Sequence, residues 1–185
     1  ANPDGVQLGT RGNANGVDLN RNFPSRNWRD GAVTHRWSFA GDERVALSPG
    51  SYAGSEPETA ALMRVIERLD PELVISIHSP LGLIDDPDDT TLGAHLADLS
   101  GLPRTVMDTG STPGSFGSWS ADDQLPTITY ELPNQSVWEM LPVHLPILNA
   151  LLEQGLACVG QIASAAISAE STDTWSTQHQ PALTS

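Results

Sequence analysis

Apolar residues recur along the chain with two different periods, and these periods predict where helices and strands lie. Residues 55–69 carry apolar side chains at every third or fourth position, which is typical of a helix with one buried face. The segment opens with Ser-Glu-Pro-Glu, so we expect Ser55 to be the N-cap. A short run of mostly apolar residues at 73–77 then predicts a buried strand that stops before His78.

The same alternation continues toward the C-terminus. The pattern predicts a helix over 91–100 that is closed by Gly101, and strands over 105–107 and 127–130. A second Ser-x-x-Glu pattern at 136–139 predicts a helix to about residue 162, kinked or split by two internal prolines. Helices that alternate with strands indicate an α/β fold. We expect three α/β/α layers around a mixed, mostly parallel sheet.

Two parts of the chain show no sustained period. Residues 1–54 are rich in Gly, Asn, Asp, Pro and Arg, which predicts long ordered loops with short strands. Loops of this length inside a domain are usually functional. Residues 163–185 are rich in Ser, Thr, Ala and Gln and are expected to form a flexible tail. Residues 1–162 are long enough to form one domain.

The composition is strongly acidic, with a net charge of −14. All nine basic residues are arginines. Such a surface repels nucleic acid and anionic membranes, and no apolar stretch is long enough to span a bilayer. We therefore expect neither as a partner. The single cysteine, Cys158, excludes a disulfide within the chain and permits a reducing compartment, so a cytoplasmic location is expected.

Two polar side chains follow predicted strands at the points where those strands end. His78 comes after 73–77, and Glu131 comes after 127–130. Because ligands of open parallel sheets bind outside the carboxyl ends of the strands, both side chains are expected at a site. They could be a metal ligand with a general base, a base with its orienting carboxylate, or a capping pair.

The segment 13–24 carries a dense set of hydrogen-bonding side chains. Asp18, Asn20 and Asn22 supply donors and acceptors, and Arg21 adds a planar cation whose fork of N–H groups fits a carboxylate. The pattern therefore indicates recognition of a carboxylate. An arginine that ties the loop to itself is the alternative.

An ordered succession of motifs resembles the zinc metallocarboxypeptidases, and most of all their bacterial murein peptide amidase branch. The likeness extends over about residues 2–160. The motifs are NPDG (2–5), TRGNANGVDLNRNFP (10–24), GSEPET (54–59), SIHSPLG (76–82), TPGSFGSW (112–119) and TYELP (129–133). The resemblance implies a carboxypeptidase-like fold and a zinc-dependent hydrolase, with residues 1–162 as the C-terminal portion of its catalytic domain.

The resemblance also implies a role for each matching residue. His78 matches the third zinc ligand, and Glu131 matches the glutamate that activates the attacking water and then protonates the leaving amine. Arg11 matches the arginine that stabilises the oxyanion. Asn20 and Arg21 match the pair that holds the terminal carboxylate of the substrate.

The sequence departs from the family at the metal. The family takes its other two zinc ligands from a His-x-x-Glu motif upstream of NPDG, and this sequence has none. A catalytic zinc needs three protein ligands, so one incompletely liganded Zn²⁺ and an inactive chain are expected. Either truncation or a degenerate relative would explain the departure. The other histidines are expected to be structural or solvated and not to replace these ligands: His35, His95, His144 and His179.

A second departure concerns the tyrosine that classical carboxypeptidases place over the substrate. The GSFGSWSADDQ segment has none, in agreement with the amidase branch. Asp122 and Asp123 are then candidates to bind the amino group of diaminopimelate, and a solvated helix end is the alternative. For Asp85 and Asp86, which lack a calcium-loop pattern, we expect turn capping near the site.

These residues favour a zinc-dependent amidase or carboxypeptidase acting on a small peptide with a free carboxylate. The substrate that the resemblance implies is the γ-D-glutamyl-diaminopimelate bond of murein peptides. One alternative is an acylase related to aspartoacylase and succinylglutamate desuccinylase. Another is a non-catalytic relative that only binds carboxylates. The sequence leaves the oligomeric state open.

Overall fold

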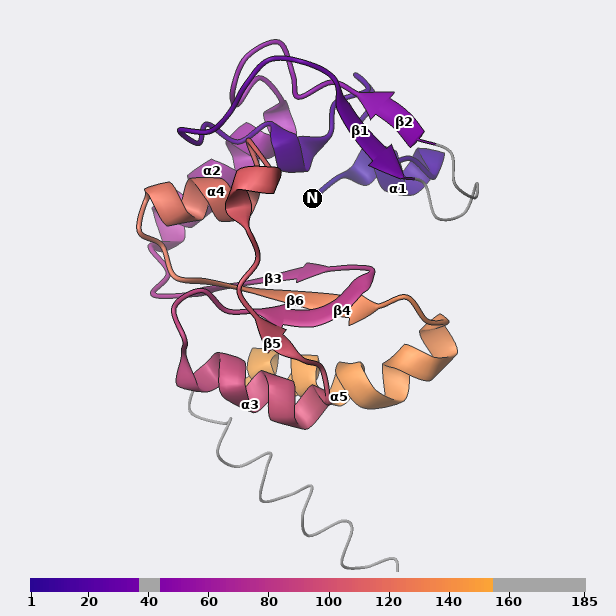
Figure 1. Ribbon diagram of the computed structural model, residues 1–185, viewed down its shortest axis with the longest axis vertical. Coiled ribbons are helices and arrows are strands. Elements are labelled where there is room, and N and C mark those ends of the chain that lie inside the picture. The colour runs from indigo at the N-terminus through magenta and orange to yellow at the C-terminus, as the bar shows by residue number, and fades with distance from the viewer. Residues whose placement is uncertain (37–43, 155–185) are drawn as a thin grey trace, which may run out of the picture. The chain divides into compact units, whose positions relative to one another are not determined.

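The structure is a computed structural model that describes residues 1–36 and 44–154 (Figure 1). The chain divides into two compact units. The first contains Ala1–Ser76 and Val106–Thr129, and the second contains Ile77–Thr105 and the chain from Tyr130 onward. None of the helices in the described ranges is long and apolar enough to cross a membrane.

The first unit consists of short elements joined by ordered loops, as expected for residues 1–54. Its elements are α1 (Pro3–Leu8), η1 (Leu19–Arg21), β1 (Val33–Arg36), β2 (Arg44–Leu47), α2 (Pro57–Leu69), η2 (Thr109–Ser111) and α4 (Phe116–Asp122). Strands β1 and β2 pair antiparallel. Helix α1 was not expected, although its signals are present: the Asn2 side chain caps Gly5 N–H at 2.9 Å, and Gly9 ends the helix in the left-handed conformation.

Three aromatic side chains form the core of the first unit. The Phe23 ring lies 5.4 Å from the ring of Phe116 and 5.7 Å from that of Trp119, measured between centroids. Leu62 and Ile66 of α2 pack against this cluster, as the helical period predicted. The prediction fails at Leu69, the last residue of the stripe, which is 69% exposed.

The four strands of the main sheet are β3 (Val74–His78), β4 (Leu81–Asp85), β5 (Arg104–Thr105) and β6 (Thr127–Pro133). They are ordered β3-β6-β4-β5, and β4 runs parallel to β5. The predicted α/β class is therefore correct. The expected strand bounds were wrong at three places: β3 includes His78 and does not stop before it, β5 lies before residue 106, and β6 continues past residue 130.

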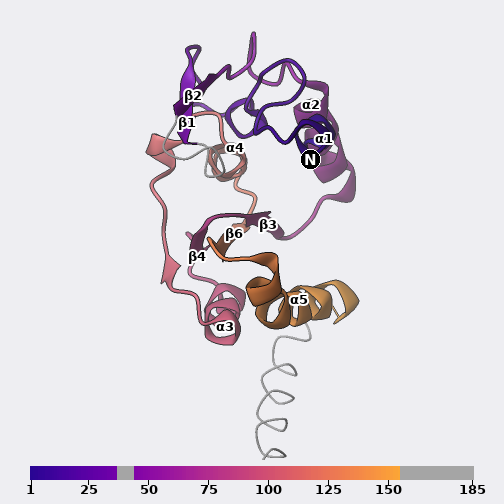
Figure 2. The ribbon, with the colours of Figure 1, turned by 90° about the vertical axis from the view of Figure 1, so that its right-hand side faces the viewer.

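The second unit places helices α3 (Thr91–Ser100) and α5 (Val137–Gln154) side by side along its strands (Figures 1 and 2). Gly101 closes α3 in the left-handed conformation, as predicted. Ser136 and Glu139 form the predicted capping box of α5, with 2.7 Å between Ser136 Oγ and Glu139 Oε2. Helix α5 runs through both of its prolines without ending. The expected helix end near residue 162 and the expected tail lie outside the described residues.

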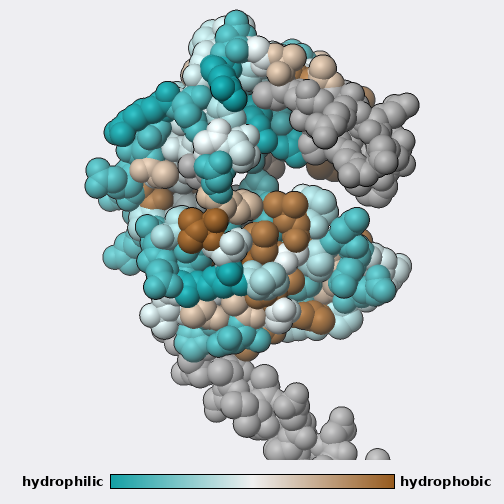
Figure 3. Space-filling view, in the orientation of Figure 1, coloured by the Kyte–Doolittle hydropathy of each residue, from teal (hydrophilic) through white to brown (hydrophobic). Residues whose placement is uncertain are grey.

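Apolar side chains are exposed on the strands of this second unit. Ile77 is 53% exposed and Leu81 is 59% exposed. Figure 3 shows apolar residues gathered along these strands, whereas polar residues cover most of the visible face of the first unit.

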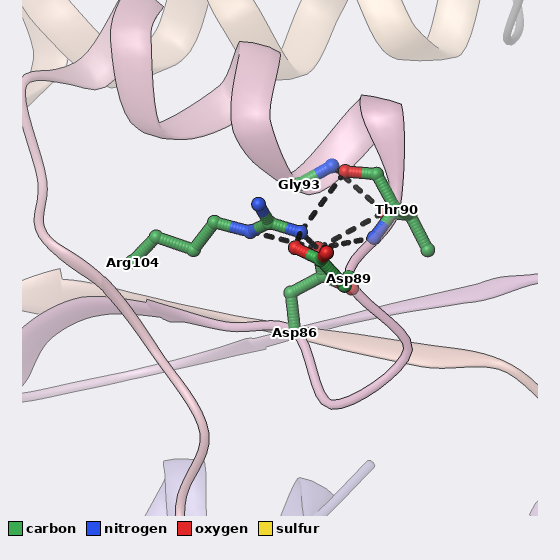
Figure 4. Close-up of polar contacts among 5 residues, drawn as sticks. All are labelled: Asp86, Asp89, Thr90, Gly93 and Arg104. Atoms are coloured by element: carbon green, nitrogen blue, oxygen red, sulfur yellow. Dashed lines mark hydrogen bonds and ion pairs between the residues drawn. The ribbon is translucent and has the colours of Figure 1, made fainter.

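A buried carboxylate joins β4, β5 and α3 in the second unit (Figure 4). Asp86 is 2% exposed, and its Oδ2 accepts hydrogen bonds from Thr90 N at 2.8 Å and Arg104 Nε at 3.0 Å. Arg104 also pairs with Asp89 at 2.7 Å. Asp86 thus caps the turn before α3, as expected for this residue.

Replacing Gly93 with alanine should destabilise the protein by roughly 1–3 kcal/mol, because the new Cβ would lie 2.0 Å from Asp86 Oδ2. Asp86 cannot move away without losing its bonds to Thr90 and Arg104. Urea unfolding measures the effect. Gly117→Ala in α4 is the matched control, since its Cβ would meet nothing within 4 Å and alanine favours helix. Equal stability of the two variants would contradict this packing.

A buried hydrogen bond ties β6 to α5. Tyr130, which is fully buried, places its hydroxyl 2.8 Å from Nδ1 of His144, and the two rings meet edge to face. Of the two expectations for His144, structural or solvated, the structural one is correct. Burial lowers the pKa of the His144 imidazole and raises the pKa of the Tyr130 phenol.

The protein should therefore lose stability as the pH falls below about 6.5, the ordinary pKa of histidine. Above that value both the folded and the unfolded states hold His144 neutral. Below it, the unfolded state takes up the proton first, which favours unfolding. Urea midpoints at about pH 7.5 and about pH 5.5 should differ less in His144→Gln than in the parent protein. His95→Gln, on α3, is the control and should keep the full difference.

Candidate active site

The candidate residues fall into two groups, one in each compact unit. Arg11, Asn20, Arg21, Asp122 and Asp123 belong to the first unit. His78 and Glu131 belong to the second.

Asp18 organises the loop of the first group. It is 3% exposed, and its Oδ2 accepts from Arg11 Nε at 2.8 Å. Its Oδ1 accepts from the backbone N–H of Asn20 at 3.1 Å and so caps the single turn of η1. Among the described residues, Nε makes the one hydrogen bond of the Arg11 guanidinium. Both of its terminal amino groups are therefore available to an anion.

The side chains of Asn20 and Arg21 are both oriented by backbone groups. Asn20 Oδ1 accepts from the backbone N–H of Phe116 at 2.8 Å, which directs the amide NH₂ away from α4. Arg21 Nη1 donates to the carbonyl of Asn20 at 2.5 Å. Within residues 1–36 and 44–154, Arg21 forms no ion pair. We call Asn20 and Arg21 the carboxylate clamp.

The electrostatic setting of Arg21 favours an anionic ligand. Burial lowers the pKa of its guanidinium, nearby Asp18 raises it, and nearby Arg11 lowers it further. A partly desolvated cation gains most from an anion that brings its own hydrogen-bond acceptors. The clamp therefore presents an amide NH₂ and a guanidinium that forms no ion pair in residues 1–36 and 44–154, and these two groups together suit a carboxylate.

Asp122 and Asp123 differ in their contacts. Asp122 Oδ2 accepts from the backbone N–H of Arg26 at 2.6 Å, so its carboxylate already holds a loop. Asp123 is exposed and lines a hollow of about 420 Å³. The lining also includes three more acidic residues and several apolar ones: Glu67, Asp70, Glu72, Met63, Ile66, Trp119 and Leu125.

In the second unit, Glu131 lies inside β6 and not after it, because the strand continues to Pro133. The carboxylate is 6% exposed, and its Oε2 accepts from Leu81 N–H at 3.4 Å. His78 is the last residue of β3, the strand next to β6. The Glu131 carboxylate therefore lies beside the segment that follows His78.

The described residues do not by themselves fit a catalytic zinc ion. No group of three His, Cys, Asp or Glu side chains in this part of the chain could hold a metal. His144 is hydrogen-bonded to the Tyr130 hydroxyl, and His95 lies on α3. The His35 side chain and His179 lie outside the described set. Because a catalytic zinc needs three protein ligands, we derive no step through a metal.

The chain belongs to the zinc carboxypeptidases, a family of hydrolases whose model matches residues 1–98. The loop motif, the clamp and the sheet agree with this assignment. The chain is 53% identical over 133 residues to murein peptide amidase A of Escherichia coli strain K12, across 71% of this chain and 55% of that protein. It is 44% identical over 153 residues to murein peptide amidase A of Vibrio campbellii, across 82% of this chain and 62% of that protein. The chain thus spans little more than half the length of these relatives.

A solved structure supports the same grouping. The chain matches the crystal structure of murein-tripeptide amidase from Escherichia coli O157 with a TM-score of 0.76 and 50% identity. The match covers 82% of this chain and 64% of that one. The expected carboxypeptidase-like fold is therefore confirmed.

The backbone contact between Phe116 and Asn20 was not predicted from the sequence. It joins positions 96 residues apart through a main-chain donor. Asp18 was recognised only as one polar residue of the loop, although it contacts Arg11 and Asn20 at once. The signal that could have found it is an aspartate two residues before the Asn-Arg pair, the spacing at which an aspartate side chain caps a turn.

Proposed function

We propose that this chain supplies the substrate carboxylate clamp and the general base of a zinc-dependent hydrolase that cleaves a peptide or amide bond near a free carboxylate. The observation that carries the proposal is the clamp. Arg21 is partly desolvated and forms no ion pair among the described residues, next to an amide whose NH₂ is directed away from α4. A substrate carboxylate would satisfy both groups.

The chemistry assigned to the remaining residues is proton transfer and charge stabilisation. Glu131 would take a proton from the attacking water and pass it to the leaving amine. Arg11, held through Nε by Asp18, would meet the negative charge that develops on the carbonyl oxygen. His78 would be one ligand of the zinc ion, which supplies Lewis-acid chemistry when it is bound.

The proposed substrate is a small murein peptide cut between γ-D-glutamate and diaminopimelate. Support comes from the relatives, which are named for murein peptides. Asp123 would bind the side-chain amino group of diaminopimelate, since its hollow carries four carboxylates. Asp122 would contribute charge to the same region while it holds Arg26.

A carboxylate-binding relative without catalysis is the second candidate. It is favoured by the absence of a three-ligand group among the described residues. The presence of Glu131 argues against this second candidate, because a protein that only binds carboxylates does not need a buried general base beside the end of β3.

The 185-residue chain alone should neither bind zinc stoichiometrically nor hydrolyse γ-D-glutamyl-diaminopimelate. A chimaera that places the part of the Escherichia coli relative preceding the matched region before Ala1 should do both. Metal analysis after dialysis and chromatography of released diaminopimelate measure these outcomes. A folded, zinc-loaded chimaera that releases no diaminopimelate would leave the carboxylate-binding candidate.

A further inference from the structure

Glu56 stands at the N-cap of α2 but does not cap that helix. Its side chain makes no hydrogen bond to the first turn. Instead, Oε2 accepts from Asn13 Nδ2 at 2.7 Å and Asn15 Nδ2 at 2.9 Å. Oε1 accepts from Ser55 Oγ at 2.6 Å. A carboxylate in the usual position of a helix cap is thus used to hold a distant loop.

The same residue also holds the other side of that loop. The backbone N–H of Glu56 donates to Asn22 Oδ1 at 3.1 Å. Asn22 is fully buried, and its Nδ2 donates to the carbonyls of Pro49 at 2.8 Å and Tyr52 at 3.1 Å. Asn13 and Asn15 precede the clamp, and Asn22 follows it directly. Glu56 therefore contacts the loop on both sides of Asn20 and Arg21.

The hydrogen bonds to Glu56 favour an ionised carboxylate. Glu56 is 5% exposed and forms no ion pair in the described ranges. Burial raises its pKa, but hydrogen bonds from Ser55, Asn13 and Asn15 outweigh burial, so the net pKa is lowered. The positive end of α2 further favours the charge. A glutamine of the same shape would lose the charge and keep an acceptor oxygen on only one side, with its NH₂ facing either the asparagine donors or the Ser55 hydroxyl.

We propose that Glu56 is a positioning residue for the carboxylate clamp, acting through Asn13, Asn15 and Asn22. This inference rests on the proposed function, because it assigns Glu56 a role toward the carboxylate that Asn20 and Arg21 would hold. A fork-shaped cation must be well aligned with its ligand, so small displacements of the loop reduce binding sharply.

The test compares two probe ligands on the 185-residue chain: γ-D-glutamyl-diaminopimelate and the same peptide with its terminal carboxylate replaced by a carboxamide. Ligand-detected NMR gives both dissociation constants. The parent chain should prefer the carboxylate by about tenfold or more. Glu56→Gln should remove most of that preference and leave the affinity for the carboxamide unchanged. Glu56→Asp, which keeps a carboxylate, should restore part of it.

Glu58→Gln is the matched control on the same helix. Glu58 reaches Asn13 only at 3.3 and 3.4 Å, so its replacement should keep the preference. Urea unfolding shows whether Glu56→Gln folds. If it does not, Asn15→Ala is the second test, because it removes one exposed donor to Glu56. It should reduce the preference partially, and an unchanged preference in this variant would overturn the inference.

The outcomes separate the positioning role from the proposed function. If Arg21→Ala loses the preference but folded Glu56→Gln retains it, the role of Glu56 is overturned and the clamp stands. If Glu56→Gln weakens both ligands by the same factor, Glu56 has only a structural role. If the parent chain shows no preference for the carboxylate, or if Arg21→Ala keeps the preference of the parent chain, the proposed function itself fails.

Discussion

Replacing Glu131 with glutamine should lower the hydrolysis rate of the chimaera by about 10²–10⁴-fold, with little change in KM. Glutamine keeps the shape of the side chain and can still accept the hydrogen bond from Leu81 N–H. It cannot take a proton from water. The loss should therefore appear in kcat, while substrate binding through the clamp persists.

Steady-state kinetics with γ-D-glutamyl-diaminopimelate measure the effect, and zinc content must be equal in the proteins compared. Glu153→Gln is the control, because Glu153 lies exposed on α5 in the same unit. It should keep the parent rate. If Glu131→Gln retains more than about a tenth of kcat, Glu131 is not the base.

Replacing Arg21 with alanine should lower kcat/KM of the chimaera about a hundredfold for the peptide with a free carboxylate. Hydrogen bonds to a charged group contribute about 1.5–3 kcal/mol each, and losing a bidentate pair costs at least roughly 3 kcal/mol. Arg21→Lys keeps the charge but not the fork, so it should recover only part of this loss.

The carboxamide peptide distinguishes binding of the carboxylate from a general effect on folding. Arg21→Ala should change kcat/KM for that peptide little. Arg64→Lys, exposed on α2, is the control for removing a guanidinium from this unit. An equal loss for both peptides would show that Arg21 holds the loop and does not read the carboxylate.

Elements with local signals were predicted well from the sequence. Helix α3 begins and ends where expected because Thr90 caps it at one end and Gly101 closes it at the other. The start of α2 was predicted wrongly for a physical reason. Glu56 takes the N-cap position, and its side chain bonds to Asn13 and Asn15, which lie 43 and 41 residues away. Such contacts have no local signature.

The candidate site shows the same division. The predicted strand ends made His78 and Glu131 candidates for one site, and their strands β3 and β6 are neighbours in the sheet. The loop composition indicated a carboxylate, but the orientation of Asn20 depends on a main-chain donor at Phe116. Asp122 was a candidate for ligand binding or for a solvated helix end, and its contact with Arg26 across 96 residues of sequence was not expected. Polar contacts between residues far apart in the sequence set the orientation of Asn20 and the partner of Asp122. Such contacts can be read only from the folded structure.

We propose that the chain belongs to an enzyme that recognises a free carboxylate beside the bond it cuts. One competition experiment tests it most directly. The zinc-loaded chimaera is given equal amounts of γ-D-glutamyl-diaminopimelate and its carboxamide, and mass spectrometry follows release of diaminopimelate and of its carboxamide. We predict release from the carboxylate peptide at least about a hundredfold faster. Equal release from both peptides, or none from either, would contradict the account.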